Sequence, residues 1–351
     1  MNPQRSPSSK RRFVAAALAS LGLVGPAFAA VARADWGPLV MLERTVLPGE
    51  KLKFSYTRSR TFEGAFLDTI VFAARGRRPG PTLCLTALVH GDERNGFEVA
   101  REVFAETDPN QLTGTLLALP AVNMNGFRTG SRYMPDRRDL NREFPGSETG
   151  SNSAIIAGIL YRTATQYCDA LIDLHTGSFD RANLPQIRVD LGHPRALELA
   201  KSFGAPVVLG GEGPRGSLRR EMMEGGIPAI IYEAGLPLRF EPAEIDKGVE
   251  GVRNVMIRMG MIAGRATPST PDRHVHARSR WQRAPLGEGG VFYPVKQLGD
   301  RVSAGDEIAY IDDPFTDRRF ILRADQAGTV IGLAVPQVVF SGYALVHIAG
   351  P

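Results

Sequence analysis

The sequence predicts an α/β fold, with a sheet covered by helices on both faces, followed by a small all-β domain. Between residues 82 and 262, short apolar segments alternate with segments of helical spacing. The apolar segments are nearly continuous, as expected of strands that are buried on both faces. Residues 281–351 instead contain several short β-type segments separated by glycine and aspartate, without helical spacing.

The individual elements follow from these patterns. Residues 40–75 are expected to form short strands and turns. Five apolar strands are then predicted at residues 82–89, 115–122, 170–174, 205–209 and 227–233. Helical spacing predicts five helices at residues 96–106, 153–170, 195–203, 218–225 and 245–262. The polar, proline-containing residues 264–280 are expected to be a linker.

The N-terminal residues 1–34 have the pattern of a cleaved export signal of the twin-arginine type. Arg11 and Arg12 precede an apolar, alanine-rich stretch, and two small-x-small sites follow at residues 27–29 and 32–34. The alternative is an N-terminal membrane anchor, but glycine and proline interrupt the apolar stretch. We therefore expect a signal peptide at 1–34, a catalytic domain at 35–265, a small β domain at 281–351, and a periplasmic protein.

The net charge does not indicate a polyanion-binding protein. The formal charge is +5, and residues 1–34 carry five basic side chains and no acid, so the remaining chain is neutral. A neutral mature chain lacks the basic excess that binding to nucleic acid requires. We expect no nucleic-acid partner and no stable membrane insertion after removal of the signal, and the oligomeric state stays open.

The two cysteines, Cys84 and Cys168, both lie in apolar segments. A disulfide is possible in an exported protein. We expect instead two unpaired, buried side chains, because cysteine commonly behaves as a small apolar residue.

Three residues have the chemistry of a zinc site. His90 and Glu93 follow the predicted strand 82–89 directly, three residues apart, and His175 follows the strand 170–174. Ligands of an open α/β sheet bind at the carboxyl ends of its strands, so these side chains are expected to meet. Two imidazoles and one carboxylate, with one open position, are typical of catalytic Zn²⁺. Asp173, two residues before His175, is expected to orient its imidazole.

Two further features indicate hydrolytic chemistry. Glu233 ends the apolar strand 227–233, and a carboxylate there can act as the general base toward a metal-bound water. The segment 132–146 holds four arginines, and arginine is well suited to binding a carboxylate through two hydrogen bonds.

The motifs HGDE, DLNREFPG, LIDLHTGS and IYEAG occur in this order, and together they resemble the succinylglutamate desuccinylase/aspartoacylase family, which is similar to the zinc carboxypeptidases. The resemblance implies a carboxypeptidase-like mixed sheet flanked by helices, and one zinc ion on His90, Glu93 and His175. It implies Glu233 as the acid/base. The other roles that it implies are substrate-carboxylate binding by Asn141 and Arg142, and polarisation of the scissile carbonyl by Arg132, for which Arg137 and Arg138 are alternatives.

The tail 281–351 is similar to a barrel-sandwich domain of the lipoyl type, but the turn between its halves lacks the lysine that carries a cofactor. The expected function of the chain is zinc-dependent hydrolysis of an N-acyl amino acid or a related carboxylate-bearing small amide. One alternative is a zinc carboxypeptidase acting on peptides or peptidoglycan fragments. Another is a non-catalytic binding protein with a zinc pocket.

Overall fold

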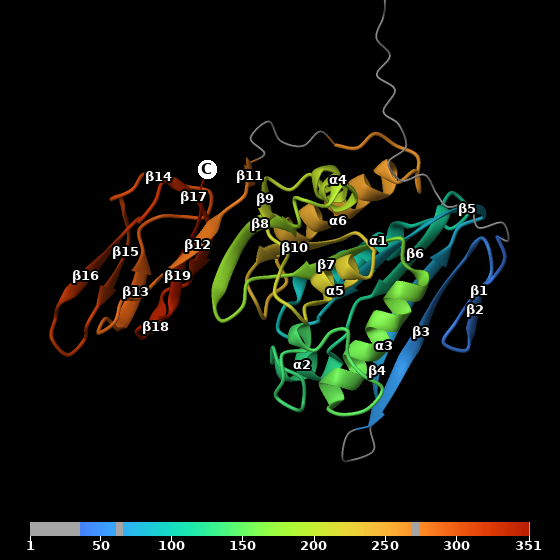
Figure 1. Ribbon diagram of the computed structural model, residues 1–351, viewed down its shortest axis with the longest axis horizontal. Coiled ribbons are helices and arrows are strands. Elements are labelled where there is room, and N and C mark those ends of the chain that lie inside the picture. Colours follow the sequence, from blue (N-terminus) through green and yellow to red (C-terminus); the bar gives the residue numbers. More distant parts are fainter. Residues whose placement is uncertain (1–35, 61–65, 268–273, 351) are drawn as a thin grey trace, which may run out of the picture.

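The computed structural model describes residues 36–60, 66–267 and 274–350, so the predicted signal peptide lies outside the described residues. Its main sheet has the strand order β12-β19-β17-β8-β10-β7-β5-β6-β4-β3 (Figure 1). The central strands β5 (Arg78–Ala87), β6 (Thr113–Leu119), β7 (Ala170–His175) and β10 (Ala229–Gly235) are parallel. Antiparallel neighbours follow on both sides, namely β4 (Phe66–Arg75), β3 (Glu50–Arg60) and β8 (Arg181–Val189).

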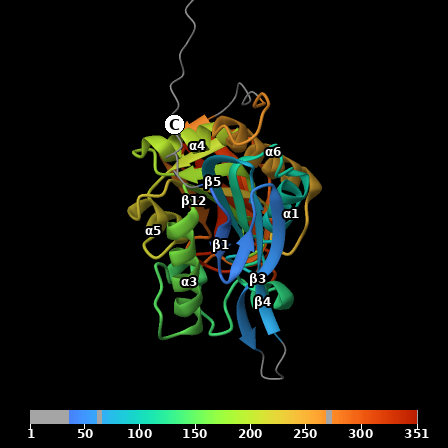
Figure 2. The ribbon, with the colours of Figure 1, turned by 90° about the vertical axis from the view of Figure 1, so that its right-hand side faces the viewer.

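Helices cover both faces of this sheet (Figure 2). On one face lie α1 (Asn95–Glu106), α4 (Pro194–Phe203) and α6 (Pro242–Arg258), which share one apolar core. On the other face, α3 (Asn152–Tyr167) and α5 (Leu218–Glu224) share a second core with the small hairpin of β1 (Leu39–Met41) and β2 (Arg44–Val46). This arrangement confirms the predicted α/β class, and the strand directions confirm a mixed sheet.

The pleat of the strands decides which side chains reach the candidate site. In β7, Ile172 and Leu174 belong to the core beneath α1, whereas Leu171 belongs to the core beneath α3. Because side chains alternate along a strand, Asp173 and His175 point to the same face as Leu171. The site is therefore on the α3 and α5 side of the sheet.

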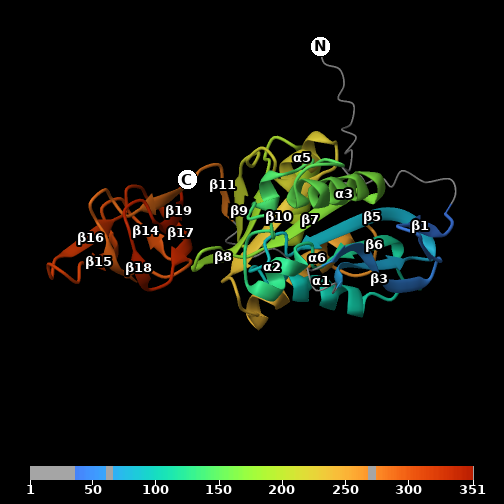
Figure 3. The same cartoon turned by 90° about the horizontal axis from the view of Figure 1, so that it is seen from below.

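The C-terminal residues form β strands, as predicted. Three of them, β12 (Ser279–Arg283), β17 (Gly328–Ala334) and β19 (Ala344–Ala349), extend the main sheet beyond β8, and β14 (Arg301–Val302) pairs with β17. Four more form a separate sheet, namely β13 (Gly290–Pro294), β15 (Glu307–Asp312), β16 (Arg319–Arg323) and β18 (Gln337–Val339). These strands enclose their own apolar core and project from one end of the molecule (Figure 3).

Several elements differ from the sequence prediction. Strand β8 was not predicted, because its sequence contains Pro185 and polar residues alternate with apolar ones along it. Part of the expected linker forms β11 (His274–His276), which pairs with β9 (Val207–Gly210), while residues 268–273 lie outside the described residues. The short strands expected in 40–75 include the long antiparallel pair of β3 and β4. A helix that was not predicted, α2 (Met124–Thr129), follows β6.

The prediction of two unpaired cysteines is wrong. Cys84 in β5 and Cys168, which follows α3, form a disulfide with a Cα–Cα distance of 5.7 Å. The two residues meet because β5 and β7 are parallel neighbours and Cys168 lies two residues before the start of β7. The separation of 84 residues in the sequence hid this proximity. No helix in the described ranges combines the length and apolarity needed to cross a membrane.

Candidate active site

His90 and Glu93 lie in a tight turn between β5 and α1. The Glu93 amide donates a hydrogen bond to the carbonyl of His90 (3.2 Å), and the helix begins only at Asn95. Both residues therefore lie before the first residue of α1. A Cβ atom at Gly91 would lie 2.1 Å from the backbone carbon of Gly126 in α2, so the turn requires glycine at this position.

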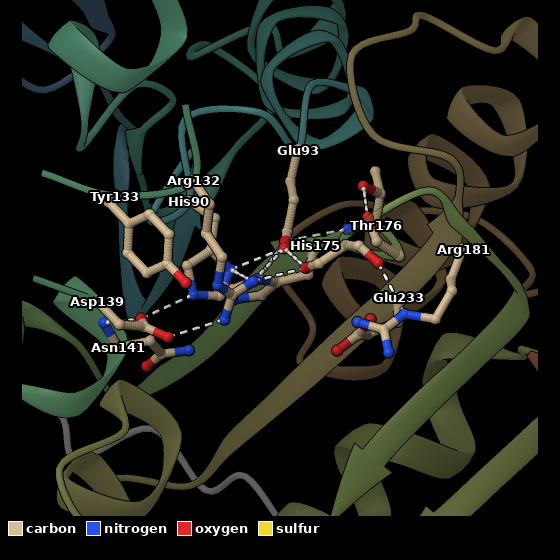
Figure 4. Close-up of polar contacts among 12 residues, drawn as sticks. His90, Glu93, Arg132, Tyr133, Asp139, Asn141, His175, Thr176, Arg181 and Glu233 are labelled. Carbon is tan, nitrogen blue, oxygen red and sulfur yellow. Dashed lines mark hydrogen bonds and ion pairs between the residues drawn. The ribbon is translucent and has the colours of Figure 1, made fainter. Parts of the chain in front are cut away.

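The structure brings His90, Glu93 and His175 together (Figure 4). Nδ1 of His90 lies 2.8 Å from Oε1 of Glu93, and Nδ1 of His175 lies 2.6 Å from its Oε2. One nitrogen or oxygen from each side chain falls within 4.8 Å of the others, and all three residues are buried. These three residues can therefore hold a metal ion.

Each imidazole also has a carboxylate on its outer nitrogen. Nε2 of His175 lies 2.8 Å from Asp173, which accepts a further hydrogen bond from Thr86 (2.7 Å). The structure thus places Asp173 where the sequence predicted it. Nε2 of His90 lies 3.1 Å from Asp139, a contact that the sequence analysis missed although Asp139 belongs to the DLNR motif. Such carboxylates fix the orientation of metal-binding imidazoles.

The electrostatics of this group are dominated by carboxylates. Burial alone would raise the pKa of Glu93, but the two imidazoles lower it well below its usual range. Burial would also lower the pKa of His175, yet Asp173 and Glu93 raise it well above its usual value. Glu93, Asp139 and Asp173 lie against the two imidazoles, and these carboxylates favour positive charge at this position, carried either by protonated imidazoles or by a bound cation.

Arg132 is the arginine of segment 132–146 that reaches this group. It donates hydrogen bonds to Glu93 (3.0 Å), Ser178 (2.5 Å) and Asp139 (2.9 Å). The hydroxyl of Ser178 in turn donates to Glu93 (2.6 Å). Of the two alternative arginines, Arg138 pairs with Glu143 instead and Arg137 is exposed.

Glu233 lies beside His175, because the two residues are register partners in the parallel strands β10 and β7. Its carboxylate accepts a hydrogen bond from Asn183 (2.6 Å) and lies 3.2 Å from Nη1 of Arg188. Both partners come from β8. In Figure 4, Glu233 lies to one side of the histidines, opposite Asp139 and Asn141. Its carboxylate is therefore fixed next to the metal-binding group without being part of it.

Asn141 and Arg142 lie in the short 3-10 helix η1 (Leu140–Arg142), where the side chain of Asp139 accepts a hydrogen bond from the backbone amide of Asn141. The side-chain oxygen of Asn141 accepts a hydrogen bond from the amide of Leu218 in α5 (2.8 Å). Together with His90, Glu93, His175, Arg132 and Glu233, both residues line one cavity of about 410 Å³. The structure thus places every predicted site residue around the same space.

The donor set fits the metal that the sequence predicted. Two imidazoles and one carboxylate are a typical ligand set of Zn²⁺, and here each imidazole has a carboxylate acceptor at its outer nitrogen. Calcium and magnesium prefer oxygen ligands, so the two imidazoles disfavour them.

Other residues of the cavity were not predicted. They come from the loop after β7, from β8, from α5 and from the C-terminal strands, and they include Ser178, Arg181, Asn183, Arg188, Arg219, Trp281, Arg283 and His347. The alternation of polar residues along β8 was the available signal for Asn183 and Arg188. The residues of the C-terminal strands carried no signal, since their approach depends on how the two sheets join.

The chain matches one protein-family model over much of its length. Residues 79–259 match the catalytic domain of the succinylglutamate desuccinylase/aspartoacylase family. This match covers more than half of the chain, and the chain belongs to that family.

Individual relatives agree with this assignment. The N-alpha-acetyl-L-2,4-diaminobutyric acid deacetylase of Halomonas elongata is 27% identical over 271 residues, which are 75% of this chain and 79% of the relative. A succinylglutamate desuccinylase/aspartoacylase from Rhodobacter sphaeroides is 25% identical, with a TM-score of 0.76 over 88% of this chain and 98% of the other. The ectoine utilization protein EutE (DoeB) from Ruegeria pomeroyi has a TM-score of 0.80 at 24% identity, over 90% and 98% of the two chains, and supports the fold alone.

Proposed function

We propose that this protein is a zinc-dependent hydrolase that cleaves the amide bond of N-acyl amino acids. The observation that carries the proposal is the convergence of His90, Glu93 and His175 within 4.8 Å on the wall of a cavity. Glu233 lies on the neighbouring strand of the same cavity. Membership of a family named for deacylases supports the reaction class, and the deacetylase of Halomonas elongata is an example among the relatives.

The residues of the site suggest separate roles in the reaction. Zinc bound by the two histidines and Glu93 would lower the pKa of a water molecule and polarise a carbonyl. Glu233 accepts the proton of the attacking water and returns it to the leaving amine, with Asn183 and Arg188 holding its carboxylate in place. Arg132 faces the same space and stabilises the negative charge that develops on the carbonyl oxygen.

The remaining predicted residues position the substrate. Asn141 and Arg142 present an amide and a guanidinium to the cavity, and these groups suit the carboxylate of an amino acid. Holding that carboxylate would place the amide beside Glu233 and the metal-binding group, which lowers the entropic cost of the reaction.

Export to the periplasm is part of the proposal. The sequence of residues 1–34 supports it, and so does the Cys84–Cys168 disulfide, because such bonds persist mainly in oxidising compartments.

The experiment is a hydrolysis screen with the zinc-loaded protein and its Glu233→Gln variant. We expect hydrolysis of at least one N-acyl amino acid by the wild type, and a loss of roughly 10²–10⁴-fold in kcat in the variant with zinc still bound. Glu224→Gln is the matched control, because Glu224 pairs with Arg220 on the surface of α5. Near-normal turnover by Glu233→Gln would disprove the role of the general base. Release of C-terminal residues from peptides, without deacylation, would favour a carboxypeptidase.

A further inference from the structure

The carboxylate of Glu93 faces two imidazoles at once, which requires a fixed orientation of its side chain. The hydroxyl of Ser178 donates to its Oε1 (2.6 Å), and the backbone amide of Thr176 donates to its Oε2 (3.3 Å). In Figure 4, Thr176 and Arg132 lie on opposite sides of Glu93. Glu93 is 1% exposed, so these protein donors take the place of water at its carboxylate.

The neighbours of the Ser178 hydroxyl decide where its single proton points. Nη1 of Arg132 lies 2.5 Å from Oγ of Ser178, and a guanidinium can only donate hydrogen bonds. The oxygen of Ser178 therefore accepts from Arg132, and its own proton is directed to Glu93. Alanine at this position would remove the donor to Glu93, whereas threonine would keep it.

Ser178 reaches Glu93 because the loop after β7 has an unusual backbone conformation. A Cβ atom at Gly177 would lie 1.9 Å from the carbonyl oxygen of Arg181, so the loop folds back tightly at this glycine. Phe179 and Asp180 have φ angles of 54° and 55°, which are unfavourable for residues with a Cβ atom. Phe179 is 45% exposed, so burial of its ring contributes little to fixing this conformation.

Hydrogen bonds from residues in or next to the C-terminal strands hold this loop. The hydroxyl of Tyr343 donates to the carbonyl of Phe179 (2.5 Å). The carbonyl of Asp180 accepts from the amide of Val335 (2.9 Å) and from the side-chain amide of Gln337 (3.2 Å). Tyr343 and Gln337 follow their acceptors by 164 and 157 residues in the sequence. The loop is thus positioned by a part of the chain that supplies none of the predicted metal ligands.

We propose that Ser178 is the positioning residue of Glu93, and that the C-terminal strands set the metal affinity of the site through the loop at 178–180. The inference rests on the metal centre of the proposed function, and it gives the C-terminal strands a role besides lining the cavity. A hydrogen bond donated to a carboxylate favours its charged form and restricts its rotation. Without the hydroxyl, Glu93 rotates away from the imidazoles in a fraction of the molecules, and the metal loses a ligand there.

The first experiment measures the zinc affinity of the full chain by competition with a chelating dye, without substrate. We expect Ser178→Ala to bind zinc roughly 10–100-fold more weakly than wild type, and Ser178→Thr to stay within a few-fold of wild type. Rescue by threonine separates the hydroxyl from the packing of the loop. Ser202→Ala is the matched control, because the hydroxyl of Ser202 donates to the carbonyl of Glu198 within α4. Wild-type affinity in Ser178→Ala, or equal losses in the alanine and threonine variants, would overturn the role of the hydroxyl.

A Tyr343→Phe variant tests the link to the C-terminal strands, because it removes only the hydroxyl that donates to Phe179. We expect zinc affinity to fall roughly 3–10-fold. The double variant Ser178→Ala/Tyr343→Phe should bind zinc as Ser178→Ala does, since both changes act through the same hydroxyl. Tyr310→Phe is the control, because the ring of Tyr310 stacks on Tyr293 within the separate C-terminal sheet. An unchanged affinity of Tyr343→Phe, or fully additive losses in the double variant, would overturn the link.

Zinc binding and amide hydrolysis are separate readouts. If wild type binds zinc but hydrolyses no amide, the proposed function fails, and the affinities of the variants still decide the inference. If wild type binds no zinc, the proposed function and the inference both fail.

Discussion

Glu93 is the residue on which the candidate metal centre depends. Each of its two oxygens faces one imidazole, at 2.8 Å and 2.6 Å, and the outer nitrogens of those imidazoles face Asp139 and Asp173. Each imidazole therefore faces Glu93 on one side and a second carboxylate on the other. Removal of one outer carboxylate should loosen one ligand without removing it.

Asp139→Asn tests this arrangement. The asparagine keeps an oxygen for the amide of Asn141 but loses the charge that faces His90. We expect zinc affinity to fall roughly 10–100-fold, measured by competition with a chelating dye. Asp246→Asn, on the exposed side of α6, is the control and should bind zinc as the wild type does. An unchanged affinity of Asp139→Asn would show that Asp139 does not support His90.

The buried imidazole of His347 leads to a prediction about how the free energy of unfolding changes at low pH. Burial and the charges of Arg188 and Arg181 lower its pKa in the folded protein to about 3, from an ordinary value of 6.5. Below pH 6.5 the unfolded chain therefore binds a proton that the native chain does not. Stability from this residue is complete above pH 6.5 and is lost as the pH falls toward 3, by about 2 kcal/mol at pH 5.

The measurement is the free energy of unfolding in urea at pH 8 and pH 5, for wild type and His347→Gln. Glutamine does not titrate, so the variant should lose about 2 kcal/mol less than wild type between the two pH values. Parallel losses in both proteins would contradict the assignment of a neutral, buried His347.

Among the elements of the fold, the loop after β7 is held by hydrogen bonds from residues next to the C-terminal strands. Phe179 and Asp180 have φ angles of 54° and 55°, which are uncommon for residues other than glycine. The hydroxyl of Tyr343 donates to the carbonyl of Phe179 (2.5 Å), and the amide of Val335 donates to that of Asp180 (2.9 Å). These contacts hold the loop that presents Ser178 to Glu93, so the C-terminal strands support the site.

The disulfide is a second connection between elements of the fold. It joins Cys84 of β5 to Cys168, two residues before the start of β7, and the metal-binding residues lie at or shortly after the carboxyl ends of these two strands. We expect the free energy of unfolding of the Cys84→Ala/Cys168→Ala variant to be about 2–4 kcal/mol lower than that of wild type, because its unfolded chain has more conformational entropy. Urea titration under oxidising conditions measures this. A stability equal to that of wild type would mean that the bond adds nothing to the folded state.

The sequence predicted the parallel core of the sheet well, because its strands are continuous apolar runs that end at functional residues. His90, Glu93, His175 and Glu233 could be found for that reason, since carboxyl ends of parallel strands share one edge. The strand β8 was missed because Pro185 and its alternating polar residues do not resemble a buried strand. Asn183 and Arg188 were missed with it.

At the scale of the whole molecule, the cavity lies where the mixed sheet meets the C-terminal strands. Local patterns predict each part separately, but they contain no information on how β17 pairs with β8 or β12 with β19. The contribution of Trp281 and His347 to the cavity depends on those pairings. Specificity is therefore the property that the sequence predicted least.

We propose that one zinc ion on His90, Glu93 and His175 makes this chain an amide hydrolase. The most direct test is to remove metal from the purified protein, titrate zinc back, and follow hydrolysis of the N-acyl amino acid found in the screen. We expect negligible turnover without metal, and a linear recovery of turnover that ends at one zinc per chain. Full activity of the metal-free protein would contradict this proposal. Full recovery of activity on addition of zinc to a His175→Ala variant would also contradict it.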